Sequence, residues 1–219
     1  MSVVTIERKV LEKNDQLAAE NRDALTRLGV FAINMVSSPG AGKTTLLERT
    51  IAALDGRVRL SVVEGDVQTD LDAQRVARYG VPVVQIVTNG GCHLEARLVR
   101  DALAQLDLAG TDVLVIENVG NLVCPANFDL GEDLKVVVLS VTEGDDKPLK
   151  YPAMFQRASV LIINKIDLVP YVDADVSAIR RHARLANPDL QIFETSCRTG
   201  EGIEEWADWL AVQADRRRA

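Results

Sequence analysis

Apolar runs of strand length alternate with helical patterns along most of this chain of 219 residues. The runs are rich in Val, Ile and Leu, as is typical of parallel strands buried on both faces of a sheet. We expect strands at Val30–Val36, Arg59–Glu64, Val83–Val87, Val113–Glu117, Lys135–Ser140, Val160–Asn164 and Gln191–Glu194. Helical patterns between many of them lie at Lys43–Leu54, Asp70–Tyr79, His93–Leu106, Ala174–Leu185 and Ile203–Gln213. This alternation predicts an α/β fold with a mostly parallel central sheet flanked by helices on both faces.

Residues 1–28 carry a helical pattern of their own, in which apolar residues recur at helical spacing between Glu, Lys and Arg. Gly29 is placed to end this helix, because glycine is favoured just past a helix C-terminus. We therefore divide the chain into an N-terminal helix at 1–28 and one α/β domain at 29–219. The terminal run Arg216–Arg218 is interpreted as a solvated helix end.

Charge and composition exclude several classes of protein. The net charge of -7 argues against a general nucleic-acid binder held by phosphate contacts. No apolar run is long enough to span a bilayer, so no membrane partner is expected. The charged N-terminus lacks the apolar centre of a secretory signal. With only Cys92, Cys124 and Cys197 present, we expect a cytoplasmic protein whose reduced thiols ligate a metal or pack in the core.

Loops that leave the carboxyl ends of parallel strands gather on one edge of the sheet, where ligands bind. The predicted strands place such loops near Ser37, Gly65, Thr88, Asn118, Val141, Lys165 and Thr195. Nearly every unusual residue of the chain lies in one of these loops. We therefore expect these residues to form a single functional edge.

The segment 37–45, SSPGAGKTT, follows a predicted strand and opens a predicted helix. This is the context of a Walker A phosphate loop, although Ser37 stands where the usual pattern begins with Gly. Lys43 would reach the β- and γ-phosphates, and the Thr44 hydroxyl would ligate Mg²⁺. The predicted phosphate-binding residues are Ser38, Gly40, Ala41, Gly42, Lys43, Thr44 and Thr45. The segment predicts a P-loop nucleoside triphosphatase, the alternative being a strand–turn–helix corner without a ligand.

The motif NKID at 164–167 also follows a predicted strand, and it resembles the NKxD guanine motif of GTPases. The Asp167 carboxylate can accept hydrogen bonds from N1–H and the amine of guanine, whereas adenine presents an acceptor at N1. The Lys165 stem can lie over the base, and Asn164 would tie loops together. One strand later, the run 195–200 looks like the SAK-type loop of GTPases, with base contacts expected from Ser196, Cys197 and Arg198. A solvated strand end would explain the tetrapeptide alone, but the ordered set of loops predicts GTP rather than ATP.

Further segments narrow the resemblance to one family. The phosphate loop resembles that of the metallochaperone and signal-recognition (SIMIBI) class of GTPases, and ENVG at 117–120 stands where a DxxG motif would be. Together with GGCH at 90–93 and the run ENVGNLVCPANFDLGE at 117–132, these motifs resemble the HypB family of hydrogenase maturation GTPases. The urease accessory GTPases are a sister family with a Cys-Pro-His triplet. Here Cys92-His93 and Cys124-Pro125 are separate, so that match is worse.

The HypB resemblance implies a function and a set of partners. It implies a GTPase that delivers nickel to nickel–iron hydrogenase, dimerises when GTP is bound, and holds a metal through Cys92, His93 and Cys124. The hydrogenase large-subunit precursor is the implied recipient. Many members also carry an N-terminal Cys-rich or His-rich nickel tract, and residues 1–28 contain neither Cys nor His. We therefore expect a separate nickel accessory protein to supply that role.

The residues themselves also suggest a metal site. Thiolates and a neutral imidazole suit Zn²⁺ or Ni²⁺, and the edge argument allows Cys92, His93 and Cys124 to converge near the nucleotide. Three ligands do not complete a four-ligand cage, but a symmetric homodimer interface would double the set. A lone Cys is more often a small buried hydrophobe, which is the interpretation preferred for Cys197. His182, among arginines, is expected at the surface.

Carboxylates near the phosphate loop are expected to help hold Mg²⁺ with Thr44. Asp66 is the first candidate and Glu117 the second, while Asp72 could position water or Mg²⁺, or simply stand at a helix N-terminus. Gly120 would offer an N–H near the γ-phosphate. The predicted catalytic residues are Lys43, Asp66, Asp72, Glu117 and Gly120. Because no Gln is evidently placed to orient water, turnover should be slow.

These sites predict a switch. The γ-phosphate would order the loops after Gly65 and Glu117, and Cys124 lies just downstream of the second loop, so GTP state and metal affinity should be coupled. Lys147 could reach the nucleotide or a partner subunit, or lie in a solvated loop. Two other functions compete: a GTPase switch acting by protein docking with structural zinc or no metal, and an ATP-dependent small-molecule kinase. The motif at 164–167 weakens the kinase hypothesis.

Overall fold

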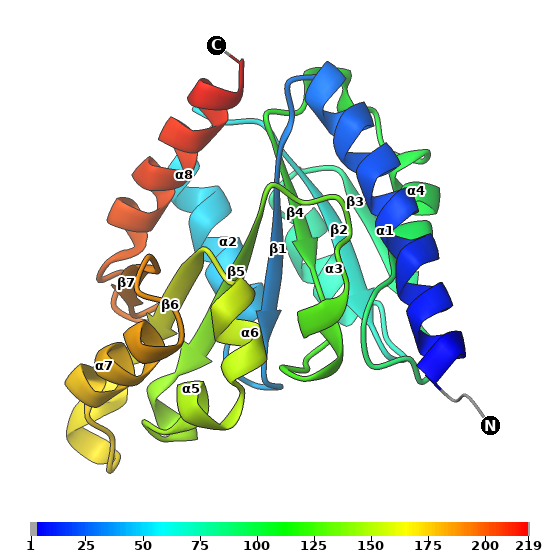
Figure 1. Ribbon diagram of the computed structural model, residues 1–219. Helices are drawn as coiled ribbons and strands as arrows, with labels where there is room; N and C mark the ends of the chain where they lie inside the picture. Colours follow the sequence, from blue (N-terminus) through cyan, green and yellow to red (C-terminus); the bar gives the residue numbers. More distant parts are fainter. Residues whose placement is uncertain (1–3, 219) are drawn as a thin grey trace.

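The computed structural model describes residues 4–218, with side chains described from Val10 onward. Its core is one seven-stranded sheet in the order β3-β2-β4-β1-β5-β6-β7, in which every neighbouring pair is parallel (Figure 1). The strands are β1 Phe31–Ser37, β2 Leu60–Asp66, β3 Val83–Val87, β4 Val113–Glu117, β5 Leu134–Ser140, β6 Val160–Asn164 and β7 Gln191–Thr195. The predicted parallel α/β architecture and all seven predicted strands are therefore confirmed.

The helices agree less closely with prediction at their ends. They are α1 Val4–Arg27, α2 Lys43–Leu54, α3 Leu71–Ala77, α4 Ala96–Leu103, α5 Lys147–Lys150, α6 Pro152–Arg157, α7 Val176–Ala186 and α8 Ile203–Arg218. Short 3₁₀ turns lie at η1 Leu108–Gly110, η2 Cys124–Asn127, η3 Val141–Glu143 and η4 Ile166–Tyr171. The helix predicted from His93 begins at Ala96 instead, which leaves Cys92 and His93 in a loop. Sequence periodicity missed α5 and α6 because each is too short to show a repeating apolar face.

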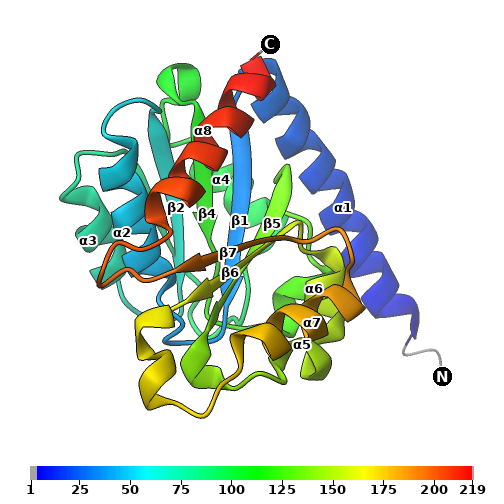
Figure 2. The ribbon, with the colours of Figure 1, turned by 90° about the vertical axis from the view of Figure 1, so that its left-hand side faces the viewer.

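Helices cover both faces of the sheet (Figures 1 and 2). On one face, α2 and α8 bury residues such as Leu47 and Trp206 against Ile33 and Val115. On the other face, α1 and α4 pack over one half of the sheet and α6 and α7 over the other. Because the strands are buried on both sides, their sequences are continuously apolar rather than alternating.

Two buried asparagines fasten α1 to the rest of the molecule. The Asn21 amide donates to the carbonyls of Ala96 and Leu130, both at 2.9 Å. Asn14 accepts from the Ala96 N–H at 2.9 Å and donates to the Asp129 carbonyl at 2.8 Å. The predicted helix is confirmed over Val4–Arg27, and the part of that prediction at residues 1–3 lies outside the described residues. Its assignment as a unit apart from the domain stays a prediction.

The run Arg216–Arg218 was interpreted as a solvated helix end; Arg216 is exposed as expected, but Arg217 and Arg218 form ion pairs. Arg217 forms an ion pair with Asp133 at 2.9 Å and donates to the Thr26 hydroxyl. Arg218 pairs with Asp112, whose carboxylate is largely buried. These contacts join the end of α8 to α1 and to the amino end of the sheet, and only tertiary structure brings these partners together.

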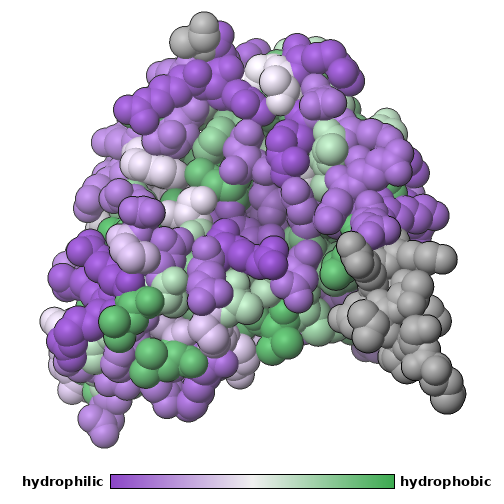
Figure 3. Space-filling model, viewed as in Figure 1, coloured by the Kyte–Doolittle hydropathy of each residue, from purple (hydrophilic) through white to green (hydrophobic). Residues whose placement is uncertain are grey.

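The surface is mostly polar in the view of Figure 3, and its apolar residues gather along the lower rim, around α5 to α7. Among the described residues, no helix combines the length and apolar character needed to cross a membrane.

Candidate functional site

The predicted site residues meet at the carboxyl ends of the strands, which point downward in Figure 1. Two cavities lie there. One of about 540 Å³ is lined by the phosphate loop and by the ends of β2 and β4, and one of about 360 Å³ by the 164–167 motif and Arg198. A further cavity of about 580 Å³ lies at the opposite, amino end of β2, and none of the predicted site residues lines it. The predicted gathering of these loops at one edge of the sheet is therefore confirmed.

The phosphate loop has the geometry of an anion cradle. Gly40 and Gly42 have φ values of 76° and 97°, a region that disfavours residues with a Cβ. A Cβ on Gly42 would also lie 2.7 Å from the Asn164 amide nitrogen. The helix α2 begins at Lys43 with no side-chain cap, which leaves its first backbone N–H groups for an anion. The Lys43 ammonium donates to the Ser37 hydroxyl at 3.0 Å, at the mouth of the loop.

Three carboxylates gather beside this loop. One oxygen from each of Glu64, Asp72 and Glu117 lies within 4.8 Å of the others. Glu64 and Glu117 are opposite each other in the β2–β4 register, and each is only 2% exposed. The Thr44 hydroxyl donates to Glu117 at 2.8 Å. Desolvation raises the pKa of both glutamates, and the nearby Glu117 charge raises that of Glu64 further.

The donor set fits a divalent cation such as Mg²⁺. Glu64 Oε2 and Glu117 Oε2 are buried and find no hydrogen-bond partner within the described part of the chain. Buried, unpartnered carboxylate oxygens are costly, and a hard cation with oxygen preference would relieve that cost. The Thr44 hydroxyl is at the same place. The residues present therefore suit the magnesium ion that a phosphate loop requires.

Sequence reasoning missed Glu64 and ranked Asp66 first. Asp66 lines the same cavity, but its carboxylate accepts the backbone N–H of Thr69 at 2.9 Å and its hydroxyl at 2.6 Å. Asp72 is in the carboxylate cluster and also pairs with Arg75 at 2.9 Å. The sequence did contain a signal for Glu64: it lies two residues before Asp66 in the same strand, and residues two apart in a strand point to the same face. The magnesium role of Asp66 stays a prediction.

The base loops are tied together as predicted. The Asn164 amide donates to the Ala41 carbonyl at 3.0 Å, and Lys165 donates to the Gly40 carbonyl at 2.6 Å. Lys165 has φ 62°, and this left-handed turn directs the chain back toward the phosphate loop. The Ser196 hydroxyl donates to Asp167 at 2.6 Å, which fixes one carboxylate oxygen.

Cys197 and Arg198 complete this second cavity. Cys197 is 8% exposed, and its thiol donates to the Asn164 side-chain oxygen at 3.4 Å. Burial raises the pKa of that thiol, as is expected of a small buried hydrophobe. The Arg198 side chain is 82% exposed and lies 4.0 Å from Asp167. The Asp167 carboxylate therefore faces the cavity with a cation beside it.

Cys92, His93 and Cys124 come together as a second ligand cluster. One ligand atom of each lies within 4.8 Å of the others, and Cys92 Sγ is 3.5 Å from His93 Nδ1. His93 Nε2 is buried and unpartnered among the described residues, and the ring packs 4.0 Å from the ring of Phe128. Desolvation lowers the pKa of His93, which favours the neutral imidazole that a metal needs. Hydrogen bonding with the Cys124 thiol raises the pKa of Cys92. The trio therefore offers two sulfurs and one nitrogen to a soft divalent cation.

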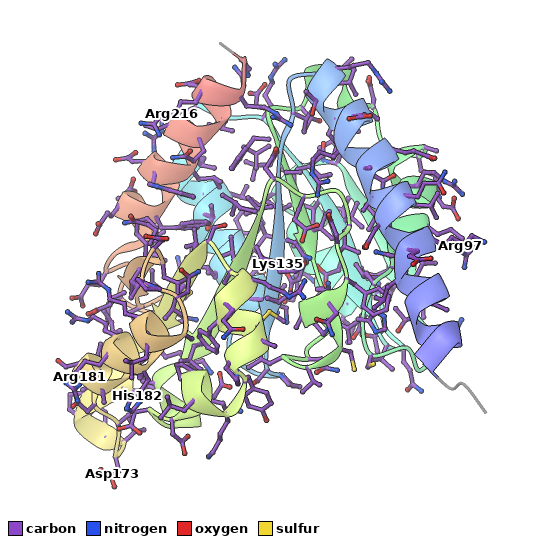
Figure 4. All side chains as sticks on the ribbon, viewed as in Figure 1. Arg97, Lys135, Asp173, Arg181, His182 and Arg216 are labelled. Atoms are coloured by element: carbon purple, nitrogen blue, oxygen red, sulfur yellow. The ribbon has the colours of Figure 1, made fainter. Side chains whose placement is uncertain are left out.

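Three other predicted residues have defined places. A Cβ on Gly120 would lie 3.2 Å from Pro39, so this residue packs directly on the phosphate loop. Lys147 is 3.3 Å from the Ser38 hydroxyl and 3.4 Å from Glu143, so it reaches the phosphate loop. The prediction that His182 lies at the surface is confirmed only in part. This residue, labelled in Figure 4, is half-buried, and its Nδ1 donates to the Asp145 carbonyl at 2.8 Å.

Known proteins resemble the chain over nearly its whole length. The family model of the CobW/HypB/UreG nucleotide-binding domain matches residues 31–194. The hydrogenase maturation factor HypB of Azotobacter vinelandii is 54% identical over 215 residues, covering 98% of this chain and 71% of that protein. The structure of Helicobacter pylori HypB in complex with nickel matches with a TM-score of 0.89 and 40% identity, over 94% of this chain and 97% of the other. The crystal structure of Archaeoglobus fulgidus HypB matches with a TM-score of 0.87 and 42% identity, over 93% of this chain and 99% of the other.

Proposed function

This chain belongs to the HypB family of hydrogenase maturation factors, and on that premise we propose that it is a GTP-hydrolysing metallochaperone. It delivers nickel during maturation of nickel–iron hydrogenase, and its GTP-dependent dimerisation is coupled to metal binding. The observation that carries this proposal is the presence, at one edge of the sheet, of a phosphate cradle, a guanine-type loop and a trio of soft metal ligands.

The choice of GTP follows from the second cavity. Asp167 keeps a carboxylate oxygen toward it, while Ser196 holds the other. A carboxylate there accepts from the N1–H and amine of guanine, and it would meet the N1 acceptor of adenine without a bond. Guanine is therefore selected over adenine because adenine would leave the Asp167 carboxylate without a hydrogen-bond donor.

Hydrolysis rests on the chain's own residues around the first cavity. Lys43 would neutralise the phosphates, Thr44 and Glu117 would hold the cation, and the Gly120 N–H would face the γ-phosphate. When bound, Mg²⁺ would neutralise part of the negative charge of the phosphates. No Gln lines this cavity among the described residues, which supports slow turnover. The role of Glu64 is to complete the carboxylate set with Asp72.

Nickel is the cargo of the Cys92–His93–Cys124 trio. The relative from Helicobacter pylori was solved in complex with nickel, and two thiolates with an imidazole are suitable ligands. Three ligands leave the coordination open, so a second copy facing the same surface would complete a shared site. The recipient is the hydrogenase large-subunit precursor, a nickel accessory protein supplies the ion, and the compartment is the cytoplasm.

A second function fits the same trio. Two thiols and an imidazole also suit a structural Zn²⁺, and the protein would then be a switch that acts by docking. A nickel-transfer assay distinguishes the metallochaperone from the docking switch. Protein loaded with Ni²⁺ should pass it to a purified hydrogenase precursor faster with GTP than with a non-hydrolysable analogue. Zn²⁺ retained in every nucleotide state, with no nickel transfer, would favour the docking switch.

A further inference from the structure

One side-chain oxygen of Asn118 bonds two loops, the loop that carries Cys92 and His93 and the loop that follows β4. It directly follows Glu117 and is 1% exposed. Its Oδ1 accepts the backbone N–H of Leu94 at 3.1 Å and that of Val119 at 3.0 Å. Leu94 follows His93, whereas Val119 belongs to the loop at the phosphate cavity. A single amide therefore joins the loop that carries Cys92 and His93 to the loop that follows β4.

The side-chain amide of Asn118 is fixed by a series of buried hydrogen bonds. Its Nδ2 donates to Asn34 Oδ1 at 3.2 Å, and the Asn34 amide donates to Glu132 at 3.1 Å. Glu132 also accepts the Leu130 N–H at 2.7 Å and pairs with Lys135, labelled in Figure 4, at 3.3 Å. Because these groups are buried and satisfied, Asn118 cannot rotate without leaving polar atoms unpartnered.

Asn121 forms a second connection between the same loops. Its amide donates to the Cys92 carbonyl at 3.3 Å, and its oxygen accepts the Val123 N–H at 2.8 Å. Gly120, between the two asparagines, packs against Pro39 of the phosphate loop. The path from phosphate loop to metal ligands therefore consists of direct contacts only.

We propose that Asn118 and Asn121 are positioning residues that transmit the state of the phosphate site to the Cys92–His93–Cys124 cluster. A shift of Gly120 toward the γ-phosphate moves the neighbouring Asn121 and with it the Cys92 carbonyl, while Asn118, held by its buried bonds, keeps the Leu94 side of the same loop in register. By linkage, metal binding biases the same segment in return. This inference rests on the proposed function, because it explains how the proposed coupling is carried.

The experiment measures Ni²⁺ affinity by competition with a coloured chelator, in the presence of Mg²⁺. Each protein is measured with GDP and with the imido analogue of GTP, and the ratio of the two affinities is the coupling factor. Asn118→Ala and Asn121→Ala are compared with wild type. Asn187→Ala is the matched control, because that side chain also makes two bonds to the backbone, to the carbonyls of Phe155 and Ala158, away from both sites. A loss of folding alone lowers both affinities and leaves their ratio unchanged.

For wild type and Asn187→Ala we expect a coupling factor of about tenfold, within the usual range for linked sites. It should fall to below about threefold in Asn121→Ala and to about one in Asn118→Ala. If Asn118→Ala is too unstable to measure, the coupling factor of Asn121→Ala, a change at a partly exposed residue, decides the test. Wild-type ratios in the asparagine variants would overturn the inference alone. A wild-type factor of one would instead refute the coupling in the proposed function, and the inference with it.

Discussion

Glu117 connects chemistry and packing at the level of a single residue, because its buried carboxylate binds the Thr44 hydroxyl and faces Glu64. We predict that Glu117→Gln, which keeps the shape and removes the charge, lowers magnesium-dependent GTP hydrolysis roughly 10- to 100-fold. The measurement is phosphate release at saturating GTP over a Mg²⁺ titration. Glu194→Gln is the control, since Glu194 pairs with Arg180 away from the phosphate loop. Equal rates in the two variants would contradict the assignment.

Glu64 gives a pH-dependent prediction. Burial raises the pKa of Glu64 above its ordinary value of 4.5, so the folded protein holds a proton that the unfolded chain releases. The resulting stability is full below that value and is lost as pH rises toward the folded pKa. Without metal or nucleotide, the free energy of unfolding should fall from about pH 5 upward, toward the folded pKa of about 11, by at most about 1.4 kcal/mol per pH unit. Urea denaturation measures this slope, and Glu64→Gln should flatten it. An unchanged slope in the variant would refute the prediction.

Local sequence was sufficient for some residues and not for others. Lys43, Thr44 and Asp167 were identified because the spacing of their motifs encodes their geometry. Glu64 was missed because its partner Glu117 comes from another strand. The partial burial of His182 was not predicted, because its bond to Asp145 joins α7 to the loop before α5 and no local pattern reports that contact.

At the level of elements, α1 is held by buried polar bonds in addition to apolar packing. We predict that Asn21→Ala lowers the free energy of unfolding by about 1–3 kcal/mol, because two buried carbonyls lose their donor. Gln16→Ala, on the exposed side of α1, is the matched control and should change stability little. Urea denaturation of both variants provides the comparison. A loss no greater in Asn21→Ala than in the control would mean that these bonds contribute no net stability.

The strands were predictable because burial on both faces demands continuous runs of Val, Ile and Leu, as in β5 and β6. The 3₁₀ turn that begins at Cys124 and the loop before Ala96 could not be predicted from the sequence. They have no periodic pattern, and their shapes depend on side-chain bonds such as those of Asn118 and Asn121. What joins the two sites therefore lies in the tertiary structure.

For the molecule as a whole, we predict that the metal ligands and the nucleotide-binding residues serve separate functions. Cys92→Ala with Cys124→Ala should remove stoichiometric Ni²⁺ or Zn²⁺ binding and leave slow GTP hydrolysis largely intact. Lys43→Ala should abolish hydrolysis, because the phosphates lose their principal cation. Metal analysis and phosphate release on the same preparations test both statements. Metal retained after loss of both thiols would show that the ligand set is wrong.

We propose that cleavage of GTP at one part of this edge changes the affinity for a soft cation at another part. The most direct measurement is the number of Ni²⁺ ions bound per protein in native mass spectra, recorded with GDP and with the imido analogue of GTP. We predict a dimer with a shared nickel ion in the analogue and a different nickel content with GDP. The same oligomer with the same nickel content in both states would contradict the claim.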